Sequence, residues 1–209
     1  MKILLADDHP IIRAGLKQIL NELAGLQLID EAINGNEVIA KTRNNEYDLI
    51  ILDISLPDRN GLDVLKQIRT EKPGALVLIL SIHPEEQYAK RVLKAGASGY
   101  LTKNSAPEEL LKAANKILSG GKYISETFAE IIAEDLARDS FRQVHELLSD
   151  REYQIMCLIA SGKSYEEIGL ELCISPKTVR SYRARILDKM KLQDNAHLIS
   201  YCVKNNLID

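Results

Sequence analysis

Short apolar runs recur through the first half of the chain and alternate with amphipathic segments. These runs occupy residues 2–6, 26–32, 48–53, 75–81 and 98–103. In the first segment between them, residues 10–23, one face of a helix is formed by Ile12, Leu16, Ile19 and Leu23. Nearly continuous apolar strands separated by helices are typical of a parallel sheet covered on both faces. The pattern therefore predicts a doubly wound α/β domain.

From residue 149 onwards the pattern is helical throughout. The segments "SDRE" (149–152) and "SYEE" (164–167) are capping boxes, and Ser175 precedes a proline suited to the first turn of a helix. We expect four helices, the last two over about 176–190 and 193–204. A tight turn at 172–175 before a basic helix predicts a helix-turn-helix.

A further helix-like segment, residues 125–139, separates the two halves. Its apolar stripe consists of Phe128, Ile131, Ile132 and Leu136, and the polar passage that follows, 140–146, is interpreted as a linker. The chain is therefore expected to have three parts, which span residues 1–121, 122–147 and 148–209.

Composition narrows the class of protein. The 209 residues are 45% hydrophobic with a net charge of −3, and residues 177–191 hold six basic residues and one acid. No apolar run approaches the roughly 20 residues that span a bilayer, and acids follow the N-terminus too soon for a signal peptide. The three cysteines, Cys157, Cys173 and Cys202, are widely spaced and are interpreted as buried apolar residues in a reducing cytosol. We expect a cytoplasmic protein with no membrane partner.

Polar side chains stand where the predicted strands end. These residues are Asp7, Asp8, Asp53, Ser81 and Lys103. Because the carboxyl ends of parallel strands lie along one edge of the sheet, we expect these side chains to converge in one crevice. Each alone has an ordinary explanation, a helix cap for Asp8 or Ser81 and a solvated lysine for Lys103, but the full set indicates a site.

The expected chemistry follows from the charges. Three neighbouring carboxylates repel unless a cation lies between them, and Mg²⁺ prefers carboxylates together with water and phosphate oxygens. One carboxylate can then act as a nucleophile towards phosphorus, while Lys103 neutralises the transferring group and Ser81 donates to one of its oxygens. His9 is interpreted as part of a His-Pro turn and is assigned no chemistry.

These residues resemble the receiver domain of bacterial two-component response regulators over about residues 1–120. The resemblance rests on the Asp7-Asp8 pair, "ISLPDRNG" after Asp53, Ser81 and "AGASGYLTK" (95–103). It implies a flavodoxin-like (βα)5 fold in which Asp53 is the phosphoacceptor. It implies that Asp8, Asp53 and the backbone carbonyl of Ser55 hold Mg²⁺, with Asp7 acting mainly through water.

The same resemblance implies the switching residues and the partner. Ser81 and Tyr100 correspond to the switch pair, and Lys103 corresponds to the residue that contacts the phosphoryl group. The implied phosphoryl donor is a sensor histidine kinase. Many receivers have proline after the lysine, so Asn104 leaves the isomer of that peptide open. Ile82 is larger than the residue usual after Ser81 and is expected to narrow access to the phosphoryl group.

The third helix of the second half has an apolar and a basic face. Val179, Tyr182, Ile186 and Met190 form the expected core stripe. The opposite face has small residues at its centre and arginines at its margins, which suits a major groove, although a solvated basic helix is the alternative. The residues expected to contact DNA are Lys177, Thr178, Arg180, Ser181, Arg183, Ala184 and Arg185.

Residues 148–190 resemble the C-terminal four-helix, helix-turn-helix DNA-binding domain of the NarL/FixJ (LuxR-type) regulators. Tyr182 stands where many members have His, and Glu166 disfavours a phosphate contact, so the preceding helix is not assigned to DNA. In this family the last helix often forms the dimer interface. The corresponding residues here are Ala196, Ile199, Cys202 and Val203.

The two resemblances together predict a response regulator. Phosphorylated on Asp53 by a sensor histidine kinase, it binds promoter DNA as a homodimer and regulates transcription, with RNA polymerase as a candidate partner. It is no turnover enzyme beyond its own Mg²⁺-dependent phosphorylation and dephosphorylation. A phosphatase with an aspartyl-phosphate intermediate needs an acid two residues after the nucleophile, where Ser55 stands. A DNA-binding protein with a relic receiver is the other alternative, and the complete set of strand-end residues disfavours it.

Overall fold

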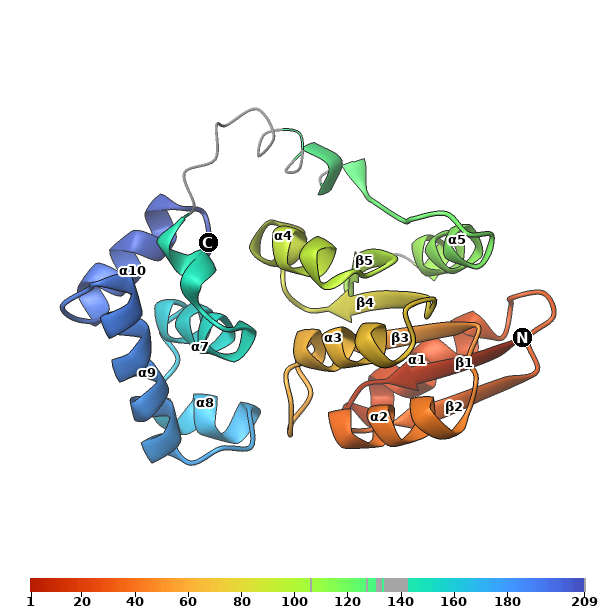
Figure 1. Ribbon diagram of the computed structural model, residues 1–209, viewed down its shortest axis with the longest axis horizontal. Helices are drawn as coiled ribbons and strands as arrows, with labels where there is room; N and C mark the ends of the chain where they lie inside the picture. Colours follow the sequence, from red (N-terminus) through yellow and green to blue (C-terminus); the bar gives the residue numbers. More distant parts are fainter. Residues whose placement is uncertain (106, 127, 131–132, 134–142, 209) are drawn as a thin grey trace. The chain divides into compact units, whose positions relative to one another are not determined.

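The computed structural model describes residues 1–105, 107–126, 128–130, 133 and 143–208. The chain divides into two compact units, Met1–Ile132 and Ala133–Asp209, which are described separately (Figure 1). The three-part division expected from the sequence, with boundaries after residues 121 and 147, stays a prediction.

The first unit is built on a five-stranded sheet in the order β2-β1-β3-β4-β5, with every neighbouring pair parallel. The strands are β1 (Lys2–Ala6), β2 (Leu28–Ala32), β3 (Leu49–Asp53), β4 (Val77–Ser81) and β5 (Gly99–Thr102). The doubly wound architecture expected from the apolar runs is confirmed. All five carboxyl ends lie at the same edge of the sheet, because all five strands run in one direction.

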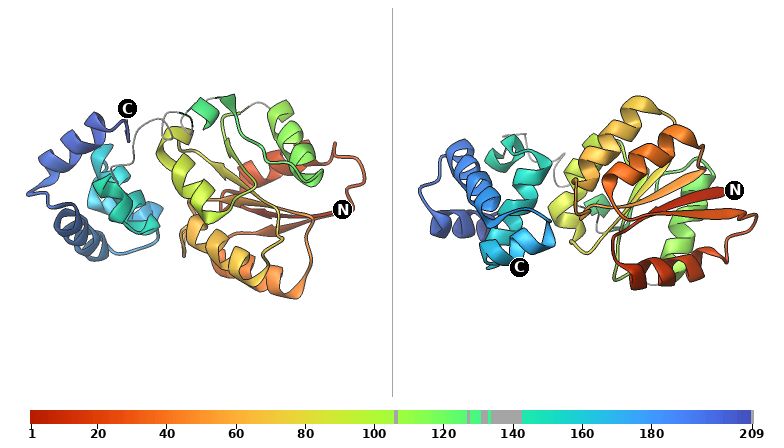
Figure 2. Two further views of the ribbon diagram at one scale, coloured as in Figure 1. Left: turned by 45° about the horizontal axis from the view of Figure 1, so that its top comes forward. Right: turned by 90° about the horizontal axis from the view of Figure 1, so that it is seen from below.

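Five helices cover the sheet. They are α1 (Pro10–Leu20), α2 (Gly35–Asn44), α3 (Gly61–Glu71), α4 (Glu85–Ala95) and α5 (Pro107–Leu118). Helices α1 and α5 pack together on one face, and α2, α3 and α4 lie in sequence on the other (Figure 2). Both faces of the central strands are therefore buried, which is why Leu49 to Leu52 read as an unbroken apolar run.

The core alternates along each strand. Ile3, Leu5, Leu49 and Ile51 belong to the apolar cluster on the side of α1 and α5. Leu4 and Ile50, which alternate with them along the chain, lie outside that cluster and are also buried. Each such side chain contributes about 1.5–3 kcal/mol when it leaves water. The alternation fixes the register of the strands and so the position of the residues at their ends.

The second unit is helical. Its elements are a 3-10 helix, η1 (Val144–Leu147), and the helices α7 (Asp150–Ala160), α8 (Tyr165–Glu171), α9 (Pro176–Met190) and α10 (Asn195–Lys204). The capping boxes at Ser149 and Ser164 are both present, and Ser175 accepts from the backbone N–H of Thr178. The four helices expected from the sequence are confirmed, with α10 beginning after the Asp194 cap.

Part of the expected linker packs into this second unit. The buried His145 in η1 places its Nδ1 3.0 Å from the hydroxyl of Tyr201 on α10, and its ring lies against Tyr153 on α7. Residues from Gln143 onwards therefore fold with the helices, although the sequence placed them in a linker.

The helix expected over 125–139 falls largely outside the described residues. Positions 126, 128–130 and 133 are helical. Phe128 is buried within the first unit, and its ring centroid lies 6.3 Å from that of Tyr100.

Two burial expectations in the second unit were wrong. Cys173 is exposed, in the turn before α9, with a φ of +50° that residues bearing a Cβ seldom adopt. Tyr182 is only half-buried, and the Arg185 guanidinium lies 4.5 Å from its ring centroid. Cys157 and Cys202 are buried as expected. Among the residues that the structure describes, no helix has the length and hydropathy to cross a membrane.

Candidate functional site

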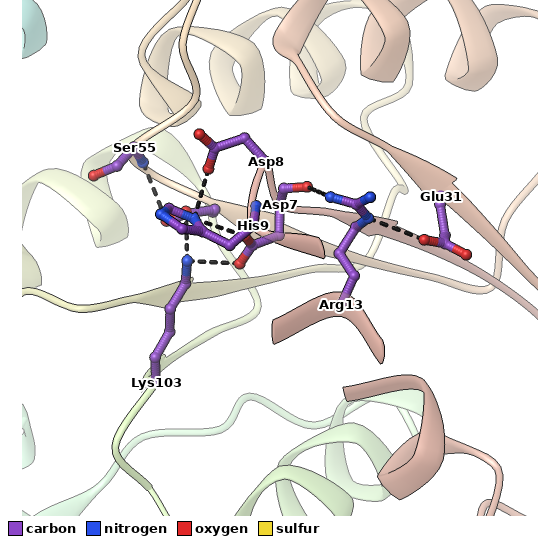
Figure 3. Close-up of polar contacts among 8 residues, drawn as sticks. Asp7, Asp8, His9, Arg13, Glu31, Ser55 and Lys103 are labelled. Carbon is purple, nitrogen blue, oxygen red and sulfur yellow. Dashed lines mark hydrogen bonds and ion pairs between the residues drawn. The ribbon is translucent and has the colours of Figure 1, made fainter. Parts of the chain in front are cut away.

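Two buried carboxylates and one buried ammonium meet at the carboxyl edge of the sheet. Asp53 ends β3 and Asp7 follows β1, and each side chain is 1% exposed. Lys103 follows β5, is 5% exposed, and places its Nζ 2.6 Å from an Oδ2 of each carboxylate (Figure 3). The convergence expected from the parallel topology is therefore present for these three residues.

The loop after Asp53 holds this carboxylate in place. The backbone N–H of Ser55 donates to Asp53 Oδ1 at 3.1 Å, and the buried Asn60 side chain accepts from the backbone N–H of Leu62 to start α3. Gly61 lies so close to β3 that a Cβ there would stand 2.1 Å from the carbonyl oxygen of Asp53. Gly61 is thus required for the loop to fold back over the strand end.

The electrostatics of the site are set by burial and by the Lys103 contacts. Burial raises the pKa of Asp53 above its ordinary value, and the Lys103 ammonium opposes part of that rise. Burial alone would lower the pKa of Lys103, but the carboxylates of Asp53 and Asp7 outweigh it and the pKa is raised. Lys103 is therefore a fixed positive charge beside Asp53.

The acidic residues fit a hard divalent cation. Ligand atoms of Asp7, Asp8, His9 and Asp53 all lie within 4.8 Å of one another. Three of the four are carboxylates, the donors that Mg²⁺ prefers. The sequence assigned His9 no chemistry, yet its Nδ1 lies 2.8 Å from Asp8 and 3.1 Å from Asp7. Its position directly after two aspartates was the signal that could have revealed this.

Ser81 and Tyr100 are brought together through a third residue. Ser81 Oγ accepts from the backbone N–H of His83 at 3.2 Å, and the Tyr100 hydroxyl donates to the His83 carbonyl at 2.6 Å. Both side chains are fully buried. Nothing in the sequence pattern singled out His83, because its backbone and not its side-chain type makes these contacts.

One question that the sequence left at this edge has a direct answer, because the peptide between Lys103 and Asn104 is trans. The Ile82 side chain is exposed next to the buried Ser81, and its narrowing of access to the phosphoryl group stays a prediction.

The basic face of α9 is open to solvent. Lys177, Arg180, Ser181, Ala184 and Arg185 are exposed, as the helical wheel predicted. Val179, Ile186 and Met190 are buried on the opposite side. Thr178 is half-buried, with its hydroxyl 2.8 Å from that of Ser175 at the helix start.

The arginines of α9 have partners inside the second unit. Arg183 is half-buried, and its Nε donates to Asn195 Oδ1 at 2.6 Å. Arg180 lies 5.8 Å from the ring centroid of Tyr165, with its Nη2 3.8 Å from Glu166. Arg183 therefore belongs to the scaffold as much as to the exposed face, whereas the Arg180 side chain is 64% exposed and its two contacts are long.

The expected dimer face on α10 requires one correction. Ala196, Ile199 and Val203 are exposed on one side of the helix. Cys202 is fully buried with Leu198, so its side chain has no access to a second copy. We therefore remove Cys202 from the expected surface.

Comparison with known proteins covers both units. The family model of the response regulator receiver domain matches residues 3–115, and that of the luxR family of bacterial regulatory proteins matches residues 146–202. Response regulator UvrY of Escherichia coli K12 is 33% identical over 208 residues, which cover 99% of this chain and 95% of UvrY. The chain belongs to the NarL/FixJ family of response regulators.

Further relatives of this response regulator agree. Response regulator GacA of Pseudomonas aeruginosa PAO1 is 32% identical over 214 residues, which cover all of this chain and 98% of GacA. A solved LuxR-family response regulator from Aurantimonas sp. SI85-9A1 is 34% identical, with a TM-score of 0.61, and covers 66% of this chain and 98% of its own. RcsB of Salmonella enterica serovar Typhimurium, bound to promoter rprA, shares the fold at 24% identity, with a TM-score of 0.65 over 96% of this chain and 97% of its own.

Family membership settles the class of function. The protein is a two-component response regulator with a receiver unit and a LuxR-type helix-turn-helix for DNA, and it is a transcription factor, not a turnover enzyme. The receiver implies a histidine kinase as its phosphoryl donor, and the acidic cluster is typical of a Mg²⁺ site. The phosphatase alternative is thereby set aside.

Proposed function

We propose that this response regulator accepts a phosphoryl group on Asp53 and that phosphorylation controls promoter binding by α9. The observation that carries the first half is the environment of the Asp53 carboxylate. One oxygen accepts from Ser55 N–H and the other from Lys103, so the group is both oriented and charge-compensated. Preorganised donors of this kind supply most of the catalysis in phosphoryl transfer.

The transfer itself needs little covalent chemistry from the chain. A carboxylate oxygen of Asp53 forms the new bond to phosphorus. The bond between phosphorus and the histidine nitrogen of the sensor kinase breaks, and its electron pair stays on that nitrogen. Lys103 stays within reach of the developing negative charge on the phosphoryl oxygens. Asp8, Asp53 and the Ser55 carbonyl would hold Mg²⁺, with Asp7 acting mainly through water, and the ion would supply positive charge beside the same oxygens.

The route of the signal starts at His83. Phosphorylation adds charge and acceptor oxygens next to Ser81, whose hydroxyl now accepts from His83. If Ser81 turns to the phosphoryl group, the backbone N–H of His83 loses this acceptor while the His83 carbonyl still accepts from Tyr100. Tyr100 packs on Phe128, so a movement of its ring reaches the segment that follows α5.

The output is proposed to be DNA binding as a homodimer. The exposed Lys177, Arg180 and Arg185 suit phosphates or guanine edges, and Ser181 and Ala184 between them permit close approach. Solved structures of RcsB include two dimers on two parallel DNAs. We extend that mode to this chain through Ala196, Ile199 and Val203, with RNA polymerase as the further partner.

The phosphoacceptor is tested by Asp53→Asn. Asn has nearly the same shape and can still accept from Ser55 N–H, so the fold should persist while Mg²⁺-dependent labelling by radioactive acetyl phosphate is lost. Asp58→Asn is the matched control, because Asp58 lies in the same loop but caps α2 through the backbone N–H groups of Gly35 and Asn36. Undiminished labelling of Asp53→Asn would refute the assignment.

A further inference from the structure

Arg13 connects the acidic cluster to a neighbouring strand. Its side chain, on α1, is only 12% exposed. Its Nη1 donates to the backbone carbonyl of Asp7 at 2.8 Å, and its Nε donates to Glu31 Oε2 on β2 at 2.9 Å (Figure 3). The other oxygen of Glu31 accepts from Lys17 at 2.5 Å. The planar guanidinium is thus anchored by Glu31 and aimed at one backbone oxygen.

That oxygen belongs to the peptide that leads into Asp8. The N–H of Asp7 donates to the Ala32 carbonyl, and its carboxylate is held by Lys103. Strand β1 ends at Ala6, so the Asp7 carbonyl lies beyond the strand and bonds to Arg13. Because the peptide unit is planar, holding this oxygen also fixes the direction in which the chain enters Asp8.

Asp8 depends on this backbone anchor more than Asp7 does. Its side chain is 30% exposed, and the contact the structure gives its carboxylate is His9 Nδ1, a side chain that is itself 58% exposed. A metal ligand needs its orientation defined to a fraction of an ångström. The support for Asp8 therefore comes from the main chain.

We propose that Arg13, held by Glu31, is a positioning residue that sets the divalent-cation affinity of the acidic cluster by fixing the Asp7–Asp8 peptide. The inference rests on the Mg²⁺ site of the proposed function and adds to it a group that touches neither the metal nor the phosphoryl group. Losing an outer contact of this kind costs about tenfold in metal affinity, the lower end of its usual range.

A charge effect and a positioning role predict opposite changes in Mg²⁺ affinity when Arg13 is replaced by a neutral residue. Arg13 is a cation near a cation site, so electrostatics alone makes Mg²⁺ bind more tightly when its charge is removed. The positioning role makes Mg²⁺ bind more weakly. Lys17→Met is the matched control. Lys17 is also a cation paired with Glu31, and the structure gives it no contact with Asp7, so the substitution removes one positive charge without the anchor.

The experiment is a Mg²⁺ titration of the full chain followed by amide ¹H–¹⁵N shifts. For Arg13→Met we expect the Mg²⁺ dissociation constant to rise about tenfold, and the Asp8 and His9 amide signals to be shifted before any metal is added. Lys17→Met should bind Mg²⁺ as tightly as wild type or more so, with those signals unmoved. Arg13→Lys keeps the charge but has one donor group for two acceptors, so it should also bind more weakly.

The outcomes separate the two levels of the argument. If wild type shows no saturable Mg²⁺ shift at Asp8 and Ser55, the metal site of the proposed function fails. If wild type binds and Arg13→Met binds equally or more tightly, the positioning role is overturned and only charge matters. Equal losses in Arg13→Met and Lys17→Met also overturn it. Should Arg13→Met not fold, Arg13→Lys decides, since an unchanged dissociation constant there contradicts the role of the two-pronged contact.

Discussion

Replacing Lys103 by Met should leave two buried carboxylates without their ammonium. Asp7 and Asp53 are each 1% exposed, and Lys103 Nζ lies 2.6 Å from both. Removing one partner of a buried ion pair costs about 3–5 kcal/mol, because the remaining charge is left uncompensated. At neutral pH and without Mg²⁺, the free energy of unfolding of the first unit should fall by that amount, a large part of the 5–15 kcal/mol typical of a domain.

The cost should depend on pH with a definite sign. Burial raises the pKa of Asp53, and Lys103 opposes the rise, so the pKa rises further in the variant. When the pKa of a carboxyl is higher in the folded than in the unfolded chain, its contribution to stability is fully present below the pKa of the unfolded chain, about 3.9. That contribution is lost as the pH rises through the pKa of the folded chain. The difference between the variant and wild type should therefore shrink as pH falls from neutral.

Mg²⁺ should compensate for part of the missing charge. At about 100 times its dissociation constant a ligand adds about 2.7 kcal/mol to stability, and the loss of a competing ammonium should make the variant bind more tightly than wild type. The assay is urea unfolding at pH 7.5 and 5.5, with Mg²⁺ or EDTA, followed by the amide signals of β1 and β3, which report on the first unit alone.

Arg43→Met is the control for this experiment. Arg43 pairs with Glu71 on an exposed surface, so the unfolding midpoint of the Arg43→Met variant should match that of wild type. Wild-type stability of Lys103→Met at neutral pH, or a cost that grows towards pH 5.5, would show that Lys103 does not compensate the buried carboxylates.

Three further predictions concern the signal route and the second unit. Phe128→Ala should remove the ring that packs on Tyr100, and the loss of a buried aromatic side chain costs about 3–5 kcal/mol of stability. Amide exchange should become faster at positions 125, 126 and 128–130 while β3 stays protected, and unchanged exchange there contradicts the proposed route. Arg180→Ala should weaken operator binding by about 1–3 kcal/mol, measured by fluorescence anisotropy at fixed salt, and should relax the base preference. Arg183→Ala should lower affinity evenly across sequences. Operator binding by Arg180→Ala equal to that of wild type contradicts the placement of Arg180 on the DNA-contacting face. Val203→Asp should weaken dimers on DNA in sedimentation without unfolding the unit, whereas Cys202→Asp should unfold it, and a folded Cys202→Asp variant would restore that residue to the dimer surface.

The sequence by itself determined the elements and the position of the candidate site. Strands buried on both faces require apolar residues at every position, so β3 and β4 stand out as runs. Helix starts at Ser149, Ser164 and Ser175 depend on hydrogen bonds within three residues, which a local pattern contains in full. Parallel strands end at one edge, so listing the residues at their ends was enough to find Asp7, Asp53 and Lys103.

Only the tertiary structure decided which groups support that site. Ser81 and Tyr100 meet on the backbone of His83, and Arg13 meets the backbone carbonyl of Asp7. Every residue has such backbone groups, so no side-chain pattern marks the ones that are used. The sequence also predicted burial for every cysteine, whereas Cys173 is exposed and Cys202 is enclosed. A small apolar residue fits either place, and only the packing of distant helices determines which one it occupies.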